Sequence, residues 1–254
     1  MPTVLALMAH PDDIEFLCAG TLVLLQRAGY SVRMATMTAG DQGSMTLARD
    51  RISRIRLAEA RASAKILGAK YTCLGFRDLT IFCSEPAKRR VTELIRKMKP
   101  DLLISHSPDD YMADHVETSK LAREAAFAST VPNWRAGRSR PLAAIPAILY
   151  ADPVETVDMY GRRAPAHRLV DISDVISIKE RMLACHESQR TWLRAQHGED
   201  EYLLSMKRWS AERGREAGVE YAEGFRRHLG HGFPKTDHLS DALGDRVMRI
   251  PVQL

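Results

Sequence analysis

The strongest constraint on the fold lies in the first fifteen residues, where an apolar run ends abruptly in charged groups. Residues 4–8 (VLALM) have the pattern of a short, fully buried strand, and AHPDD follows directly. Pro11 fixes its own φ and disfavours a helical conformation for His10, so the strand stops here. The apolar residues after Glu15 predict a helix that ends at Gly29. We therefore expect the polar cluster at the carboxyl end of the first strand, where open α/β sheets bind their ligands.

The polar residues of this cluster are His10, Asp12 and Asp13. An imidazole and carboxylates at this spacing suit a divalent metal. A second strand pattern at residues 102–105 is followed by a similar set, which contains His106, Asp109, Asp110, Asp114 and His115. Because two strand ends of one parallel sheet can converge, the two sets together predict a shared metal site. The alternative is that each set only caps the helix that follows it, as Asp and Ser often do.

Strand and helix patterns alternate along most of the chain. The predicted strands are residues 31–37, 70–74, 102–105, 145–150 and 169–172. The predicted helices are residues 46–67, 86–98, about 116–129, 174–196 and about 200–218. The Gly-containing loop 38–44 is expected to border the site, and the loop 131–146 to rim the pocket. The fold class is α/β, a Rossmann-like three-layer α/β/α arrangement with a mostly parallel sheet and additional C-terminal helices.

Length and composition place the chain among globular proteins. Its 254 residues, 45% of them hydrophobic and 27% charged, suit a single domain over 1–254, with an extension at about 237–254. No apolar segment is long enough to span a bilayer, and no signal peptide is evident. Four cysteines without paired spacing predict reduced thiols and a cytoplasmic location. The net charge of +5 is spread over helical patterns without a nucleic-acid motif, so no nucleic-acid partner is expected.

The same motifs resemble the PIG-L/LmbE-like family. AHPDD at 9–13, TAGDQGS at 38–44, RLAEA at 56–60 and the Asp114–His115 pair occur in the order seen in that family. HESQ at 186–189 and YAEGF at 221–225 are similar to bacterial members. The members are metal-dependent N-deacetylases, most of which act on N-acetylglucosamine conjugates. The resemblance therefore implies a small N-acetylated substrate and a homo-oligomer, either a trimer or a hexamer.

The resemblance also implies roles for individual residues. It makes His10, Asp13 and His115 the metal ligands and leaves Asp12 free as the general base. Zinc is the first choice of metal and ferrous iron the alternative, since two imidazoles and one carboxylate suit both. It implies catalytic roles for two further residues, Arg56 beside Asp12 or the substrate and Asp114 as the group that orients His115 or the base. The implied substrate contacts are Asp78, Tyr111 and His186.

Three of these residues have ordinary structural readings when the resemblance is set aside. Arg56 is then one surface arginine among several, Asp78 a loop carboxylate paired with Arg77, and His186 a satisfied core histidine. Zinc ligation leaves coordination positions open, as a catalytic site requires. We expect the metal to activate a water, and Asp12 to take its proton during attack on an acetamide carbonyl.

The chain departs from the family pattern at Met112. Many members carry a histidine three residues before the last metal ligand, where it donates to the oxyanion, and a thioether cannot donate. Tyr111, His106 or a residue from elsewhere in the chain could replace it, or the metal could stabilise the oxyanion alone.

The main reading is a zinc-dependent N-deacetylase of an N-acetylamino sugar or of a sugar-containing small molecule. Two alternatives to it stay open. They are a metal-bearing binding or regulatory protein with decayed catalysis, and a deacylase of a non-sugar amide. A dinucleotide-binding oxidoreductase is disfavoured, because the first strand lacks the Gly-x-Gly-x-x-Gly turn.

Overall fold

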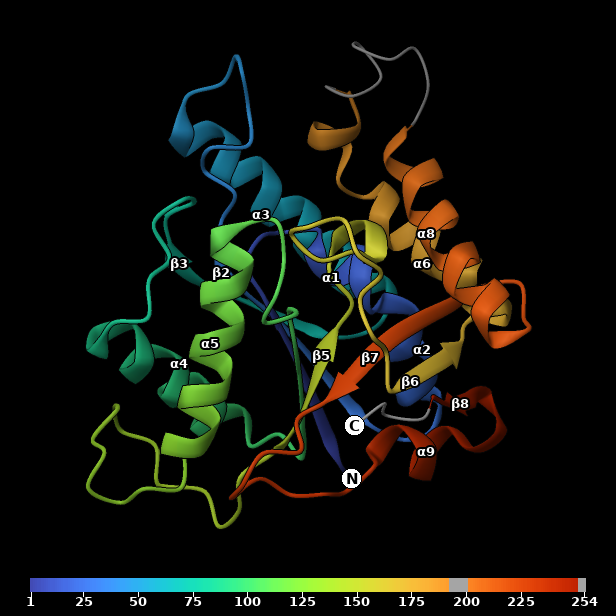
Figure 1. Ribbon diagram of the computed structural model, residues 1–254. Helices are drawn as coiled ribbons and strands as arrows, with labels where there is room; N and C mark the ends of the chain where they lie inside the picture. Colours follow the sequence, from blue (N-terminus) through green and yellow to red (C-terminus); the bar gives the residue numbers. More distant parts are fainter. Residues whose placement is uncertain (192–200, 251–254) are drawn as a thin grey trace.

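The computed structural model describes residues 1–191 and 201–250. Its strands form one sheet in the order β3-β2-β1-β4-β5-β7-β6-β8 (Figure 1). The strands are β1 (Thr3–Met8), β2 (Ser31–Thr38), β3 (Lys70–Phe76), β4 (Leu102–Ser105), β5 (Ala147–Ala151), β6 (Arg168–Asp171), β7 (Ala222–Arg227) and β8 (Val247–Arg249). The helices are α1 (Asp13–Leu17), α2 (Ala19–Arg27), α3 (Arg49–Ile66), α4 (Glu85–Met98), α5 (Ala113–Ala128), α6 (Ile176–Ala184), α8 (Glu201–Ala217) and α9 (His238–Leu243).

The sheet has a parallel half and an antiparallel half. Strands β3, β2, β1, β4 and β5 pair in parallel, whereas β7, β6 and β8 continue the sheet antiparallel. Helices cover both faces of the parallel half (Figure 1). The predicted α/β class is confirmed. Strand β7 was not predicted, because its sequence AEGFRR lacks apolar alternation. Gly224 in β7 is needed there, since a Cβ would lie 2.0 Å from the carboxylate of Asp152.

The buried strand β1 divides the core into two layers. Val4, Ala6 and Met8 belong to the cluster that packs against α1, α2 and α6, and Leu5 and Leu7 to the cluster under α4 and α5. All five are fully buried. A parallel strand covered by helices on both sides is apolar throughout, which explains the uninterrupted run in the sequence.

The candidate site lies where β1 and β4 end side by side. Leu7 pairs with Ser105, so the segments after β1 and β4 leave the sheet together. Strand order reverses here, because β1 connects to β2 on one side and pairs with β4 on the other, which makes this edge a topological switch point. Helix α5 begins at Ala113 rather than near residue 116, so Asp114 and His115 stand in its first turn.

Three predictions about segments are wrong. The helix expected after Glu15 is two helices, broken at Cys18, where φ is −149°. The helix expected over 174–196 is interrupted: α6 ends at Ala184, residues 187–191 are helical again, and residues 192–196 lie outside the described part of the chain. The loop 131–146 contributes no residue to the pocket described below. This loop joins the end of α5 to the start of β5. It therefore lies at the edge of the sheet opposite the strand ends that hold the site.

The C-terminal segment also joins the sheet. β8 pairs with β6, and α9 packs against α2. Residues 251–254 of the predicted extension lie outside the described residues. Within the described chain, no helix has the length and apolar content needed to cross a membrane.

Candidate metal centre and active site

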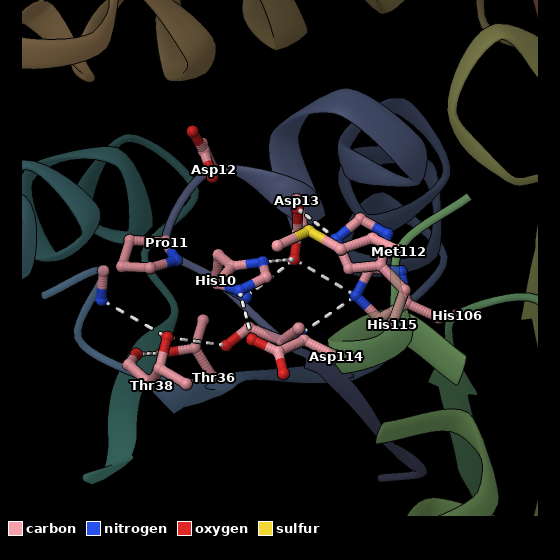
Figure 2. Close-up of polar contacts among 12 residues, drawn as sticks. His10, Pro11, Asp12, Asp13, Thr36, Thr38, His106, Met112, Asp114 and His115 are labelled. Carbon is pink, nitrogen blue, oxygen red and sulfur yellow. Dashed lines mark hydrogen bonds and ion pairs between the residues drawn. The ribbon is translucent and has the colours of Figure 1, made fainter. Parts of the chain in front are cut away.

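His10, Asp13 and His115 converge at the ends of β1 and β4 (Figure 2). The carboxylate of Asp13 lies 3.4 Å from Nδ1 of His10 and 3.5 Å from Nε2 of His115. One donor atom from each of the three buried residues lies within 4.8 Å of the other two. Two imidazoles and one carboxylate at this separation fit a single divalent cation and leave coordination positions for other ligands.

The second ring nitrogen of each candidate histidine ligand contacts a further carboxylate. Nε2 of His10 lies 3.1 Å from Asp114, and Nδ1 of His115 lies 2.9 Å from Asp110. Such partners fix the tautomer and orientation of a ligating imidazole. Asp114 was predicted to orient His115 or the base, but the structure places it on His10 instead. Adjacent residues of a helix project about 100° apart, so Asp114 and His115 face different neighbours.

A third histidine, His106, packs against His115 on the buried side of the site. The backbone amide of Ala9 donates to its Nε2 (2.9 Å), which also lies 3.1 Å from the carboxylate of Asp13. Its ring stacks on His115 at 4.0 Å, and burial together with His115 lowers the pKa of His106 to about 4. It is fully buried and does not line the pocket. His106 therefore does not reach the pocket, whereas Tyr111 lines it.

The titration of the candidate ligands reflects their mutual contacts. Burial opposes the charged form of His10, yet contacts to Asp114 and Asp13 raise the pKa of His10 to about 10. Burial likewise opposes the charge on His115, and Asp13 and Asp110 raise its pKa to about 9. Burial alone would raise the pKa of Asp13, but the imidazoles hold it well below its usual range. Positive charge is thus favoured at this point, and a metal cation would replace the imidazole protons.

Asp12 points away from the three candidate ligands (Figure 2). Its φ of 110° lies in the left-handed region, which is unusual for a residue with a side chain and turns its carboxylate to the other side of the chain from Asp13. Arg56 donates to one carboxylate oxygen (3.1 Å), and the Tyr202 hydroxyl donates to the other. Burial raises the pKa of Asp12, although the Arg56 guanidinium opposes this. A carboxylate that adjoins a metal site without joining it suits a general base.

Arg56 is a buried residue of the site rather than a surface arginine. Its Nη2 also donates to the carbonyl of Pro11 (2.8 Å). A Cβ at Gly40 or Gly43 would lie 2.4 Å from its Nη1, so both glycines of the loop after β2 make room for the guanidinium. This explains why the TAGDQGS and RLAEA motifs occur together.

The site opens into a pocket of about 440 Å³. Asp78 and Tyr111 line it, as predicted for substrate contacts. Asp78 is not paired with Arg77; one of its oxygens accepts from the backbone amide of Gln42 (2.9 Å), and the other has no partner among the described residues. The complete lining is His10, Asp12, Asp13, Phe16, Gln42, Gly43, Arg56, Asp78, Leu79, Tyr111, Met112, His115, Val154, Gln189, Tyr202 and Trp209.

His186 lies behind the pocket rather than in its lining. Its ring is fully buried, and Nε2 lies 3.5 Å from the carboxylate of Glu15. The following residues hold the turn in place: Ser188 donates twice to Glu59 (2.7 Å each), and Gln189 donates to the carbonyl of Gly43 (3.0 Å). Gln189 is the member of this motif that lines the pocket.

Several pocket residues were not predicted as functional. They are Phe16, Val154, Gln189, Tyr202 and Trp209, whereas Gln42 and Gly43 belong to the loop 38–44 that was expected to border the site. Tyr202 and Trp209 recur at helical spacing on α8, which in a sequence is the pattern of core packing. The polar Gln189 lay in a recognised motif, and this was the one signal that could have identified it.

The fold and the site define an α/β protein with a candidate metal centre at the carboxyl edge of its sheet. Residues 5–126 match the family model described as PIG-L, GlcNAc-PI de-N-acetylase. The resemblance drawn from the motifs is therefore confirmed for a PIG-L family domain over residues 5–126, just under half of the chain.

Curated relatives and solved structures agree with this assignment. The chain is 29% identical over 239 residues to diacetylchitobiose deacetylase of Thermococcus kodakarensis, covering 88% of this chain and 82% of that protein. It is 30% identical over 151 residues to 1D-myo-inositol 2-acetamido-2-deoxy-alpha-D-glucopyranoside deacetylase of Corynebacterium glutamicum, over 48% of this chain and about half (52%) of that protein.

Among solved structures, N,N'-diacetylchitobiose deacetylase from Pyrococcus horikoshii superposes with a TM-score of 0.76 at 27% identity, over 93% of this chain and 88% of that one. The 4-carboxy-2-hydroxymuconate hydratase of Pseudomonas putida superposes with a TM-score of 0.74 at 21% identity, over 93% of this chain and all of that one. At this lower identity the likeness shows the shared fold alone.

Proposed function

We propose that this protein is a metal-dependent amide hydrolase that removes the acetyl group from an N-acetylamino sugar or a sugar-containing small molecule. The observation that carries the proposal is the His10–Asp13–His115 cluster with the unligated carboxylate of Asp12 beside it. The relatives named above, which are deacetylases of N-acetylated sugars by name, support the reaction class.

The proposed chemistry divides among this chain's own residues. His10, Asp13 and His115 would hold the cation, which would supply Lewis acidity that polarises the amide carbonyl and lowers the pKa of water. Asp12 takes the proton of the attacking water and returns it to the departing amine. Arg56 and Tyr202 hold the two oxygens of Asp12 in place.

Tyr111 is the proposed donor to the carbonyl oxygen. It stands next to Met112, which cannot donate, and its ring packs edge-on against His115 at 5.5 Å. Its side chain lines the pocket and is 67% exposed, so a substrate can reach it. Its phenolic hydroxyl is protonated at neutral pH and can donate a hydrogen bond.

The polar groups of the pocket suit a sugar. Asp78 lines the pocket together with Gln42 and Gln189, whose side-chain amides can donate to and accept from hydroxyl groups. His186 has no direct route to the substrate, and we propose that it supports the pocket wall through Glu15.

Zinc is the proposed metal, with ferrous iron as the alternative. We also propose that residues 1–254 form one domain and that the protein is cytoplasmic, in keeping with its four free cysteines. We propose further that it assembles as a trimer or hexamer. Sedimentation of the purified protein checks the last of these.

The direct test is metal analysis followed by an acetate-release screen over N-acetyl sugars and their conjugates. We expect about one bound metal per chain and acetate release from at least one sugar. Bound metal without acetate or amine release from any N-acyl sugar would favour the binding-protein alternative. Absence of bound metal after reconstitution with zinc and with ferrous iron would remove both readings.

A further inference from the structure

The pocket over the candidate metal centre has two chemically different halves. The polar half is lined by Gln42, Arg56, Asp78 and Gln189. Hydrogen bonds link these residues. The backbone amide of Gln42 donates to Asp78, and the Gln189 side chain donates to the carbonyl of Gly43, which lies next to Arg56. This half can satisfy the hydroxyl groups of a sugar.

The other half of the pocket is apolar and mostly aromatic. It is lined by Phe16, Tyr111, Val154 and Trp209. The Phe16 ring lies 4.6 Å from Tyr202 and 5.6 Å from Trp209. Because Trp209 follows Tyr202 by seven residues on α8, the wall extends about 10 Å along the helix from the group that binds Asp12.

This apolar half is larger than the proposed reaction needs. An acetyl group brings only a methyl, and the polar half already serves the hydroxyls. Phe16 and Trp209 are both partly exposed, and Tyr111 is 67% exposed. Partly exposed apolar side chains that line a pocket are typical of a binding site for an apolar group.

Part of the apolar half lies beyond the matched family region. The family match ends at residue 126, whereas Val154 and Trp209 lie after it. The family assignment therefore does not by itself predict what this half binds.

We infer that the natural substrate carries an apolar or aromatic substituent next to its N-acylated sugar, and that Phe16, Tyr111, Val154 and Trp209 bind it. The inference rests on the proposed function. The substituent comes from one of two parts of the substrate: an acyl chain longer than acetyl, or an aglycone. Both bring hydrocarbon against the same wall.

Two substrate series distinguish these sources. The first varies the acyl group of glucosamine from acetyl through butyryl and hexanoyl to benzoyl. The second keeps N-acetyl and varies the β-glycoside from methyl through butyl to phenyl. Release of free amine is measured for each. We expect kcat/KM to rise in one series by about fourfold per buried methylene, chiefly through KM.

The outcomes separate this inference from the proposed function. Amine release that is flat or declines along both series overturns the inference and leaves the deacetylase proposal standing. No amine release from any member, with metal bound, overturns the deacetylase proposal itself.

Matched variants test whether Trp209 and Val154 bind the apolar substituent. In Trp209→Ala and in Val154→Ser, the preference for the larger substituent over the smallest is expected to fall at least about fivefold. Leu204→Ala, on the exposed side of α8 and outside the pocket, is the control and keeps the preference. Asp78→Asn is expected to weaken all members of a series alike. A preference that Trp209→Ala and Val154→Ser leave unchanged contradicts the assignment.

A binding measurement avoids dependence on turnover. Calorimetric titration of the protein with the phenyl β-glycoside of glucosamine, compared with the methyl β-glycoside, reports the contact directly. Tighter binding of the phenyl compound, lost in Val154→Ser, is expected if the aglycone is the source. Equal affinity, together with a flat acyl series, contradicts the inference.

Discussion

At the scale of single residues, two adjacent carboxylates have opposite environments. Asp13 lies among three imidazoles, and its pKa is held well below the usual range, although burial alone would raise it. The pKa of Asp12 is raised by burial despite the neighbouring guanidinium. The positive φ at Asp12 produces this division, because it turns consecutive side chains to different partners. One carboxylate is thus suited to a cation and the other to a proton.

We therefore predict that Asp12→Asn retains the metal and loses turnover. Asparagine keeps the shape and the hydrogen bond from Arg56 but cannot accept a proton as a base. Loss of a general base costs about 100- to 10,000-fold in kcat. Metal content by emission spectrometry and kcat on the best substrate check this. Asp13→Asn is the comparison, and it should lose metal. Near-normal turnover of Asp12→Asn would contradict the assigned role.

A second prediction concerns the space beside Arg56. Gly43→Ala places a Cβ 2.4 Å from Nη1, so the guanidinium must move and its contact with Asp12 is weakened. A misplaced group near the reacting atoms can cost about 100-fold. We expect kcat to fall roughly 10- to 100-fold with the circular dichroism spectrum unchanged.

Gly29→Ala is the control for this prediction. Nothing lies within 4 Å of a Cβ at Gly29, although its φ of 90° adds some strain. It should lower stability without lowering kcat. Full activity in Gly43→Ala would show that Arg56 does not position the base.

At the scale of elements, the parallel half of the sheet could be predicted from the sequence, but the side of the pocket formed by α8 could not. Buried strands such as β1 and β4 are continuous apolar runs, and the residues that follow them identify the strand ends. Helix α8 reads only as an amphipathic helix, because a tyrosine that binds Asp12 and one that packs in a core have the same spacing. Strand β7 was missed because Gly224 is required by its contact with Asp152, not by any local pattern.

The C-terminal element offers a prediction on pH. Asp237 caps α9 and accepts from Arg168 on β6 (2.8 Å to Nε), with Arg227 3.6 Å away. Burial alone would raise the pKa of Asp237, but the hydrogen bonds from Arg168 and Ser240 hold it below its usual value. A depressed carboxyl pKa contributes stability above the unfolded pKa, about 3.9, and this is lost as pH falls through the folded pKa.

We expect Asp237→Asn to lower the free energy of unfolding by about 1 kcal/mol at neutral pH, after allowance for solvent screening. The gap from the unmodified protein should stay constant from about pH 7 to pH 5 and narrow below about pH 3.9. Urea unfolding at a series of pH values measures it. A gap that widens on acidification would contradict the sign derived from this contact.

At the scale of the whole molecule, the site is assembled from distant parts of the chain. The candidate ligands come from the first and fourth strand ends, whereas Gln189, Tyr202 and Trp209 come from the last third of the sequence. The motifs predicted which candidate ligands converge, since the carboxyl ends of parallel strands lie at the same edge of a sheet. They could not fix the opposite wall, because helix packing depends on tertiary contacts such as Phe16 against Tyr202.

Because the cation would join β1 to α5 across the centre of the sheet, its binding should stabilise the whole fold. A ligand that binds only the folded state at about 100 times its Kd adds about 2.7 kcal/mol. For a chain of this size, that corresponds to a rise in Tm of roughly 5–10 °C. Calorimetric scans of the chelator-treated protein with and without Zn²⁺ or Fe²⁺ measure the shift. His115→Ala should abolish it, whereas His231→Ala, outside the cluster, should keep it. A shift that survives in His115→Ala would place the stabilising cation somewhere other than between these two elements.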